Sequence, residues 1–186
     1  MTKRYLQTKE ETFVVNPVIT WLKNQKANWR HIHKPKHGLS ETGWDIEAQR
    51  HNMDLLIEAK YITGPFLSSF AGLVTAPLAK RPQHRMKIKY RSWCHNICWA
   101  IGSSEEIGNV YQLLLDYFSR NLLFWKHYIN DLKLKYIFFV KDKKVAKLTS
   151  KKLLEISWAY KNTSEGKKIK VRREIARELM KNIKYK

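Results

Sequence analysis

The sequence predicts an α/β domain in which a central mixed β-sheet is flanked by helices. Short apolar stretches with strand periodicity alternate with longer stretches whose apolar residues repeat at helical spacing. Hydrophobic residues make up 44% of the 186 residues and aromatic residues 12%, which is enough apolar material for a packed core. This length is typical of one domain. We predict a core of residues 1–162 and a basic, amphipathic C-terminal helix of residues 163–186 that packs on it.

The first part of the chain is predicted to form a helix, three strands and a second helix. Residues 10–26 repeat apolar side chains at helical spacing, and Pro17 is expected to bend this helix or to shift its start. Alternating or apolar segments indicate strands at residues 29–34, 43–50 and 53–60. The last two strands are separated by a short polar turn at His51 and Asn52, as in a hairpin.

The next segment, residues 61–79, has no charged residue and nearly reaches the ~20 residues of a membrane span. Because it contains Gly64, Pro65, Gly72 and Pro77, we expect a buried helix over residues 65–79 and no membrane association. The elements predicted after it are a strand at 93–101, a helix at 110–128, a strand at 135–140, a helix at 153–160 and a last helix after Gly166.

The chain is strongly basic, and this limits the classes of partner. It contains 36 Lys and Arg against 16 Asp and Glu, a formal charge of +20. Such an excess favours a polyanion, because neutralised phosphates release their counterions. Nucleic acid is the first partner to expect, ahead of an anionic membrane surface. The two cysteines and the absence of an apolar leader at the N-terminus are typical of a cytoplasmic protein.

Two acidic residues and a lysine form the most unusual pattern in this basic chain. Asp45 lies on one predicted strand, and Glu58 and Lys60 lie two apart on the next, with their Cα atoms separated by about 6.6 Å on one face. If the strands pair as a hairpin, Asp45 lies opposite Glu58. Converging carboxylates repel unless a cation lies between them, and a hard divalent ion with oxygen ligands suits that position. The alternative is an ordinary surface ion pair between Glu58 and Lys60.

This pattern resembles the PD-(D/E)-x-K superfamily of metal-dependent nucleases, which includes many restriction endonucleases and Holliday junction resolvases. The resemblance covers residues 10–79 and implies a restriction-endonuclease-like core. It assigns metal ligation to Asp45, Glu58 and the Ala59 carbonyl, and assigns the attacking water to Lys60. Some members add a glutamate from the first helix, for which Glu11 is the preferred candidate and Glu10 the reserve. Trp44 stands where the motif often has a proline, which lowers the specificity of the match.

The resemblance implies a Mg²⁺-dependent endonuclease, with Mn²⁺ as a substitute, that cuts DNA in a restriction-type or structure-specific manner. It also implies a homodimer, since these reactions need two active sites. The alternative function is a non-catalytic nucleic-acid-binding protein with the same fold. A peripheral membrane protein is a third class.

Other residues are candidates for DNA contacts or for a different metal. DNA contacts are expected from two basic segments, at Lys80, Arg81, Arg85, Lys87, Lys89, Arg172, Arg173 and Arg177. The alternating histidines His31, His33 and His37 are more typical of a solvated edge than of a zinc site. Cys94 and Cys98 lack a second ligand pair at zinc-finger spacing and are expected to be buried and inert.

Overall fold

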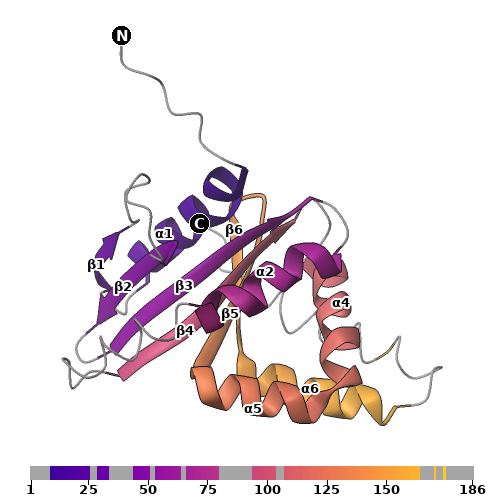
Figure 1. Ribbon diagram of the computed structural model, residues 1–186. Coiled ribbons are helices and arrows are strands. Elements are labelled where there is room, and N and C mark those ends of the chain that lie inside the picture. Colours follow the sequence, from indigo (N-terminus) through magenta and orange to yellow (C-terminus); the bar gives the residue numbers. More distant parts are fainter. Residues whose placement is uncertain are drawn as a thin grey trace.

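A mixed six-stranded sheet organises the part of the chain that the structure describes (Figure 1). This computed structural model describes residues 9–25, 29–33, 44–50, 53–63, 66–79, 94–103, 107–163, 170 and 174. The strands, in spatial order, are β1 (Arg30–His33), β2 (Ile46–Arg50), β3 (Met53–Ile62), β4 (Cys94–Ser103), β5 (Leu134–Lys141) and β6 (Lys144–Thr149). β3, β4 and β5 are parallel, whereas β1, β2 and β6 pair antiparallel with their neighbours.

Helices cover both faces of this sheet, which confirms the predicted α/β class. They are η1 (Glu11–Val15), α1 (Asn16–Lys23), α2 (Phe66–Ala79), α4 (Ile107–Arg120), α5 (Leu122–Leu132) and α6 (Ser150–Lys161). Figure 1 shows α2, α4, α5 and α6 on one side of the sheet and α1 on the other. Within the described residues, more helix lies on the side of α2, α4, α5 and α6 than on the side of α1.

The face under α2, α4, α5 and α6 holds the larger core, which is rich in aromatic side chains. Trp99 of β4 and Phe70 of α2 are buried at its centre, and their rings meet edge to face with centroids 5.3 Å apart. Phe118 and Trp125 stack with centroids 4.2 Å apart. Such ring pairs contribute about 0.5–1.5 kcal/mol beyond the area they bury. The aromatic contacts thus tie α2, α4 and α5 to the middle of the sheet.

The opposite face holds the smaller core, which η1 and α1 cover through Val14, Val15, Val18 and Leu22. Pro17 lies in the first turn of α1, and its nitrogen cannot donate to the Phe13 carbonyl as a regular helix requires. The preceding turn is instead π-helical, and the Asn16 N–H donates to the Glu11 carbonyl five residues back. Pro17 therefore marks the start of α1 within a continuous helical segment.

Gly102 of β4 allows η1 to approach the sheet closely. A Cβ atom placed on Gly102 would lie 2.5 Å from Val14 Cγ2 and 3.5 Å from the Phe13 carbonyl oxygen. β4 continues through this glycine to Ser103, beyond the predicted strand at 93–101. The absent side chain serves helix packing rather than strand termination.

Two other features of the structure differ from the predicted elements. The single helix at residues 110–128 is divided into α4 and α5 at Asn121, whose side chain accepts a hydrogen bond from the Phe124 N–H and caps α5. The strand β6 was not predicted, because its lysines mask a short apolar pattern and its hairpin turn has no glycine. The turn residues Asp142 and Lys143 nevertheless have φ values of 48° and 65°.

The predicted C-terminal helix lies outside the described residues, except for Lys170 and Glu174. The uncharged segment that nearly reaches the length of a membrane span contains α2. No helix in the described ranges has the length and apolar character needed to cross a bilayer.

A Gly102→Ala substitution should destabilise the fold by about 1–3 kcal/mol, because the new methyl group overlaps Val14. Gly72→Ala is the matched control, since nothing lies within 4 Å of its added Cβ and α2 gains a better helix former. Urea denaturation of both variants measures the free energy of unfolding. Adding Val14→Ala to Gly102→Ala should recover part of the loss, and an unchanged free energy in Gly102→Ala would contradict the close approach.

The thiol of Cys98 should be inert in the folded protein. Cys98 is fully buried, and burial raises the pKa of its thiol to about 12. Because the thiolate is the reactive form, a Cys94→Ser variant should react with a disulfide reagent only slowly between pH 7 and 10. Reaction after unfolding in guanidinium is the control. Fast reaction of the folded protein at pH 8 would show that Cys98 is accessible.

Candidate active site

The candidate site lies where β3 extends beyond its neighbour β2. Within the described residues, the pairing of β2 with β3 ends at Ile46 and Ile57, whereas β3 continues to Ile62. On its other side β3 pairs with β4 along its whole length. We call residues 58–62 the β3 overhang. The predicted Glu58-Ala59-Lys60 segment is part of it.

Two carboxylates accept hydrogen bonds from the backbone of the overhang. The Ala59 N–H donates to Asp45 Oδ2 at 2.7 Å, and the Tyr61 N–H donates to Glu10 Oε2 at 3.4 Å. Alternate residues of a strand direct their backbone groups to the same neighbour, so these are the positions that another strand would otherwise bond. Side-chain oxygens from the segment before β2 and from the first helix thus replace a strand partner.

Glu58 and Lys60 lie on the same face of β3, as predicted. Lys60 Nζ is 3.4 Å from Glu10 Oε2, and the two side chains are 41% and 32% exposed. An ion pair this exposed contributes little stability. Its effect is to orient the lysine: the oxygen that accepts from Tyr61 also holds the Lys60 ammonium group at the overhang.

Glu58 is half-buried and lies near Tyr128 of α5. Burial raises the pKa of Tyr128 above its ordinary value, and the negative charge of Glu58 raises it further. The Tyr128 hydroxyl donates to the Val74 carbonyl of α2 at 2.7 Å. A neutral phenol therefore links α5 to α2 beside the Glu58 carboxylate.

The structure brings four of the predicted residues together: Asp45, Glu58, Ala59 and Lys60. Of the two candidate glutamates, Glu10 contacts the overhang, through the Tyr61 N–H and the Lys60 ammonium group. Glu11 is half-buried in the same turn, and its assignment as a metal ligand stays a prediction.

The donor atoms at this site suit a hard divalent cation. Two carboxylates, of Asp45 and Glu58, come from adjacent segments. The Ala59 carbonyl points to the same side of β3 as the Ala59 N–H, which is the side of Asp45. Mg²⁺ binds oxygen ligands and commonly takes only one or two protein carboxylates. No three His, Cys, Asp or Glu side chains gather as a metal-binding group in the described ranges.

Several predicted residues lie outside the described side chains. These are the basic candidates Lys80, Arg81, Arg85, Lys87, Lys89, Arg172, Arg173 and Arg177, the histidines His31, His33 and His37, and Cys94. Trp44, which stands where the motif often has a proline, is only 3% exposed and packs in the larger core. It therefore does not offer a surface to a ligand.

Sequence reasoning missed the part played by the backbone. The N–H groups of Ala59 and Tyr61 are what gather Asp45 and Glu10 around Lys60. The predicted strands at 43–50 and 53–60 have equal lengths, so nothing in the sequence indicated an overhang. No family model, curated protein or solved structure matches the chain.

Proposed function

We propose that the protein is a metal-dependent endonuclease that hydrolyses phosphodiester bonds of DNA. The observation that carries the proposal is the 2.7 Å hydrogen bond from the Ala59 N–H to Asp45 Oδ2. It fixes a carboxylate against the backbone of the Glu58-Ala59-Lys60 segment, in a chain of charge +20. Carboxylates at the site suit a cation, and the excess positive charge of the chain suits a phosphate backbone.

The residues that would hold the metal are Asp45, Glu58 and the carbonyl of Ala59. A bound Mg²⁺ would supply Lewis acidity at the phosphate and an activated water. The chain itself supplies orientation. The Ala59 N–H holds one oxygen of Asp45, which restricts rotation of the carboxylate, and the short polar segment before β2 keeps that side chain at the level of Glu58.

Lys60 is the group proposed to act on the attacking water and on the charge that develops on phosphorus. Its ammonium group shares a strand face with Glu58 and is 41% exposed, so a substrate can reach it. Contact with Glu10 Oε2 limits the positions that the long side chain can adopt. Glu10 is then a positioning residue for Lys60, which is a role the sequence did not assign.

The order of elements supports the proposed likeness to the restriction-endonuclease core. A helix with an early glutamate precedes the strand that follows Asp45, and the strand with Glu58 and Lys60 leads into α2. Cutting both strands of DNA needs two such sites, so we propose a homodimer that acts in the cytoplasm. The basic segments at residues 80–91 and 163–186 would grip the substrate.

One observation favours a second candidate, a nucleic-acid-binding protein without catalysis. Asp45 and Glu10 satisfy backbone N–H groups at an open strand edge, and this is a sufficient structural reason for two carboxylates to be there. Such a protein would bind nucleic acid in a salt-dependent manner, without cleavage and without response to divalent ions.

Asp45→Asn should reduce cleavage of plasmid or branched DNA in Mg²⁺ by about 100-fold or more, because a ligand charge is lost. The amide oxygen of asparagine can still accept from the Ala59 N–H, so the fold should be kept. Lys60→Ala should reduce cleavage comparably. The matched controls are Asp131→Asn and Lys161→Ala, which change exposed residues on α5 and α6. Undiminished cleavage in Asp45→Asn would rule out the proposed chemistry.

Mn²⁺ should stabilise the protein in the absence of DNA. A ligand that binds only the folded state at a hundredfold excess over its Kd raises the melting temperature by roughly 5–10 °C for a chain of this size. The rise should be lost in Asp45→Asn and in Glu58→Gln. It should be kept in the control variant Glu155→Gln, whose carboxylate contacts Lys152 on the same helix. A melting temperature unaffected by Mn²⁺ would favour the non-catalytic candidate.

A further inference from the structure

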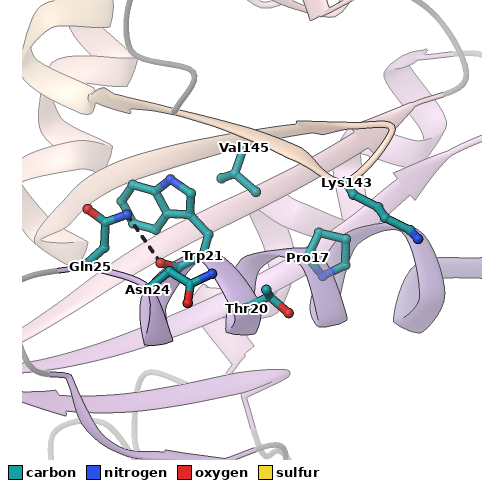
Figure 2. Close-up of a pocket in the computed structure, with 7 residues that line it drawn as sticks. All are labelled: Pro17, Thr20, Trp21, Asn24, Gln25, Lys143 and Val145. Carbon is teal, nitrogen blue, oxygen red and sulfur yellow. Dashed lines mark hydrogen bonds between the residues drawn. The ribbon is translucent and has the colours of Figure 1, made fainter. Parts of the chain in front are cut away.

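A second feature, on the other face of the sheet, is a narrow groove between α1 and the hairpin of β5 and β6 (Figure 2). On the helix side its lining residues are Pro17, Thr20, Trp21 and Asn24, which follow one another at helical spacing and form a single stripe. Gln25, Val145 and Lys143 complete the lining. This stripe differs from the buried stripe of Val14, Val18 and Leu22, so α1 packs on the sheet with one side and borders the groove with another.

Lys143 is fixed at one end of the groove by the hairpin turn. Asp142 and Lys143 are the two residues between the paired Lys141 and Lys144, and both have positive φ, as a type I′ turn requires. Figure 2 shows Lys143 at the Pro17 end of the groove, with the Trp21 indole toward the other end. The turn geometry therefore determines where this ammonium group lies.

Lys147 and Lys135 approach the other end. Lys147 Nζ is 5.7 Å from the centroid of the Trp21 ring and 4.7 Å from that of Tyr136, and Lys135 Nζ is 5.5 Å from the Tyr136 centroid. Cation–π contacts of this kind help to hold a lysine in place. Both ammonium groups thus lie beside the Tyr136 ring.

A β-bulge explains why Lys135 reaches this face. Ile97 pairs with Leu134 and Cys98 pairs with Tyr136, which leaves Lys135 as the extra residue. Its Nζ lies 3.7 Å from Met53 Sδ, at the start of β3. Arg50, exposed at the end of β2, is a third cation near Tyr136. Burial raises the pKa of Tyr136, and the positive charge of Arg50 opposes that rise.

The size of the groove excludes an enclosed small-molecule ligand. Its volume is about 50 Å³. Pockets that enclose cofactors or drug-sized ligands are typically about 300–1,000 Å³. A ligand can insert only the edge of a planar group here while the rest of it lies along the surface between the lysines. An extended polyanion with planar side groups has this shape.

We propose that the groove binds single-stranded nucleic acid. Phosphates contact Lys143 at one end and Lys147 and Lys135 at the other. An unpaired base lies against Trp21, with Thr20, Asn24 and Gln25 available to its polar edge. The Gln25 amide already donates to the Trp21 carbonyl at 3.3 Å, which holds it beside the groove. The groove is separate from the candidate active site, because Met53, which lies beside Lys135, is about 23 Å along β3 from Lys60. The inference therefore does not rest on the proposed nuclease.

The test measures binding of a short fluorescein-labelled oligothymidylate to the full chain by anisotropy, in EDTA so that no cleavage can occur. Lys135→Gln together with Lys147→Gln should weaken binding about tenfold or more and reduce the slope of log K against log salt by roughly 1.4. Lys126→Gln together with Lys161→Gln is the matched control, since it removes the same charge from exposed positions on α5 and α6. The control should change neither quantity appreciably.

Lys143→Asn is a second variant. It should disturb the fold little, because Lys143 is exposed and asparagine tolerates its positive φ. It should weaken binding of the single strand and affect duplex DNA less. Equal losses for the groove and control variants would overturn the proposal. So would an equal loss for duplex and single strand, or a groove-dependent retention by phosphatidylserine vesicles without retention of the oligonucleotide.

Discussion

The central constraint in this structure is that β3 is longer than the strand beside it. Beyond Ile57 its backbone donors on that side have no partner from β2, and a donor left without an acceptor costs about 1–3 kcal/mol where water is excluded. Asp45 and Glu10 provide the acceptors. The need to satisfy two N–H groups therefore gathers two carboxylates, and Glu10 in turn orients Lys60. The chemistry of the site is a consequence of how the sheet ends.

The unequal covering of the sheet has a second consequence. Four helices press an aromatic core against one face, with Trp99 and Trp125 buried among their neighbours. Among the described residues, the other face is covered by η1 and α1, which cross it as one helical run. A single helix is too narrow to cover both the centre of the sheet and the hairpin of β5 and β6. Polar and aromatic residues of α1 consequently border the groove beside β6.

Much of the fold was predictable because its apolar runs are short and clearly bounded. The predicted strand at 53–60 became β3, and the predicted helix at 65–79 became α2, since turn residues flank both. The break at Asn121 was not predictable from periodicity, because the apolar spacing continues across it and only the cap reveals two helices. β6 was missed because its core-facing Val145 and Leu148 are interspersed with lysines.

For the candidate site, the hairpin of β2 and β3 followed from spacing, although Asp45 lies just before β2 and not on it. The contacts of Glu10 with Tyr61 and Lys60 could not be predicted, because they depend on how η1 packs on the sheet. The groove was beyond sequence reasoning altogether. Trp21 is distant in the chain from Lys135 and Lys147, and a bulge in β5 brings Lys135 to the face on which Lys147 meets Trp21.

Gly102 also has a consequence for the order in which the molecule assembles. The β2–β3 hairpin is local, so Asp45 can reach Ala59 early, whereas β3 and β4 pair residues as distant as Met53 and Cys94. The η1 turn packs against Gly102 of β4, so it has no complete docking surface until that long-range pairing exists. Glu10 is thus delivered to Lys60 late in folding. A partly folded chain would hold Asp45 at β3 but leave Lys60 without the carboxylate that orients it.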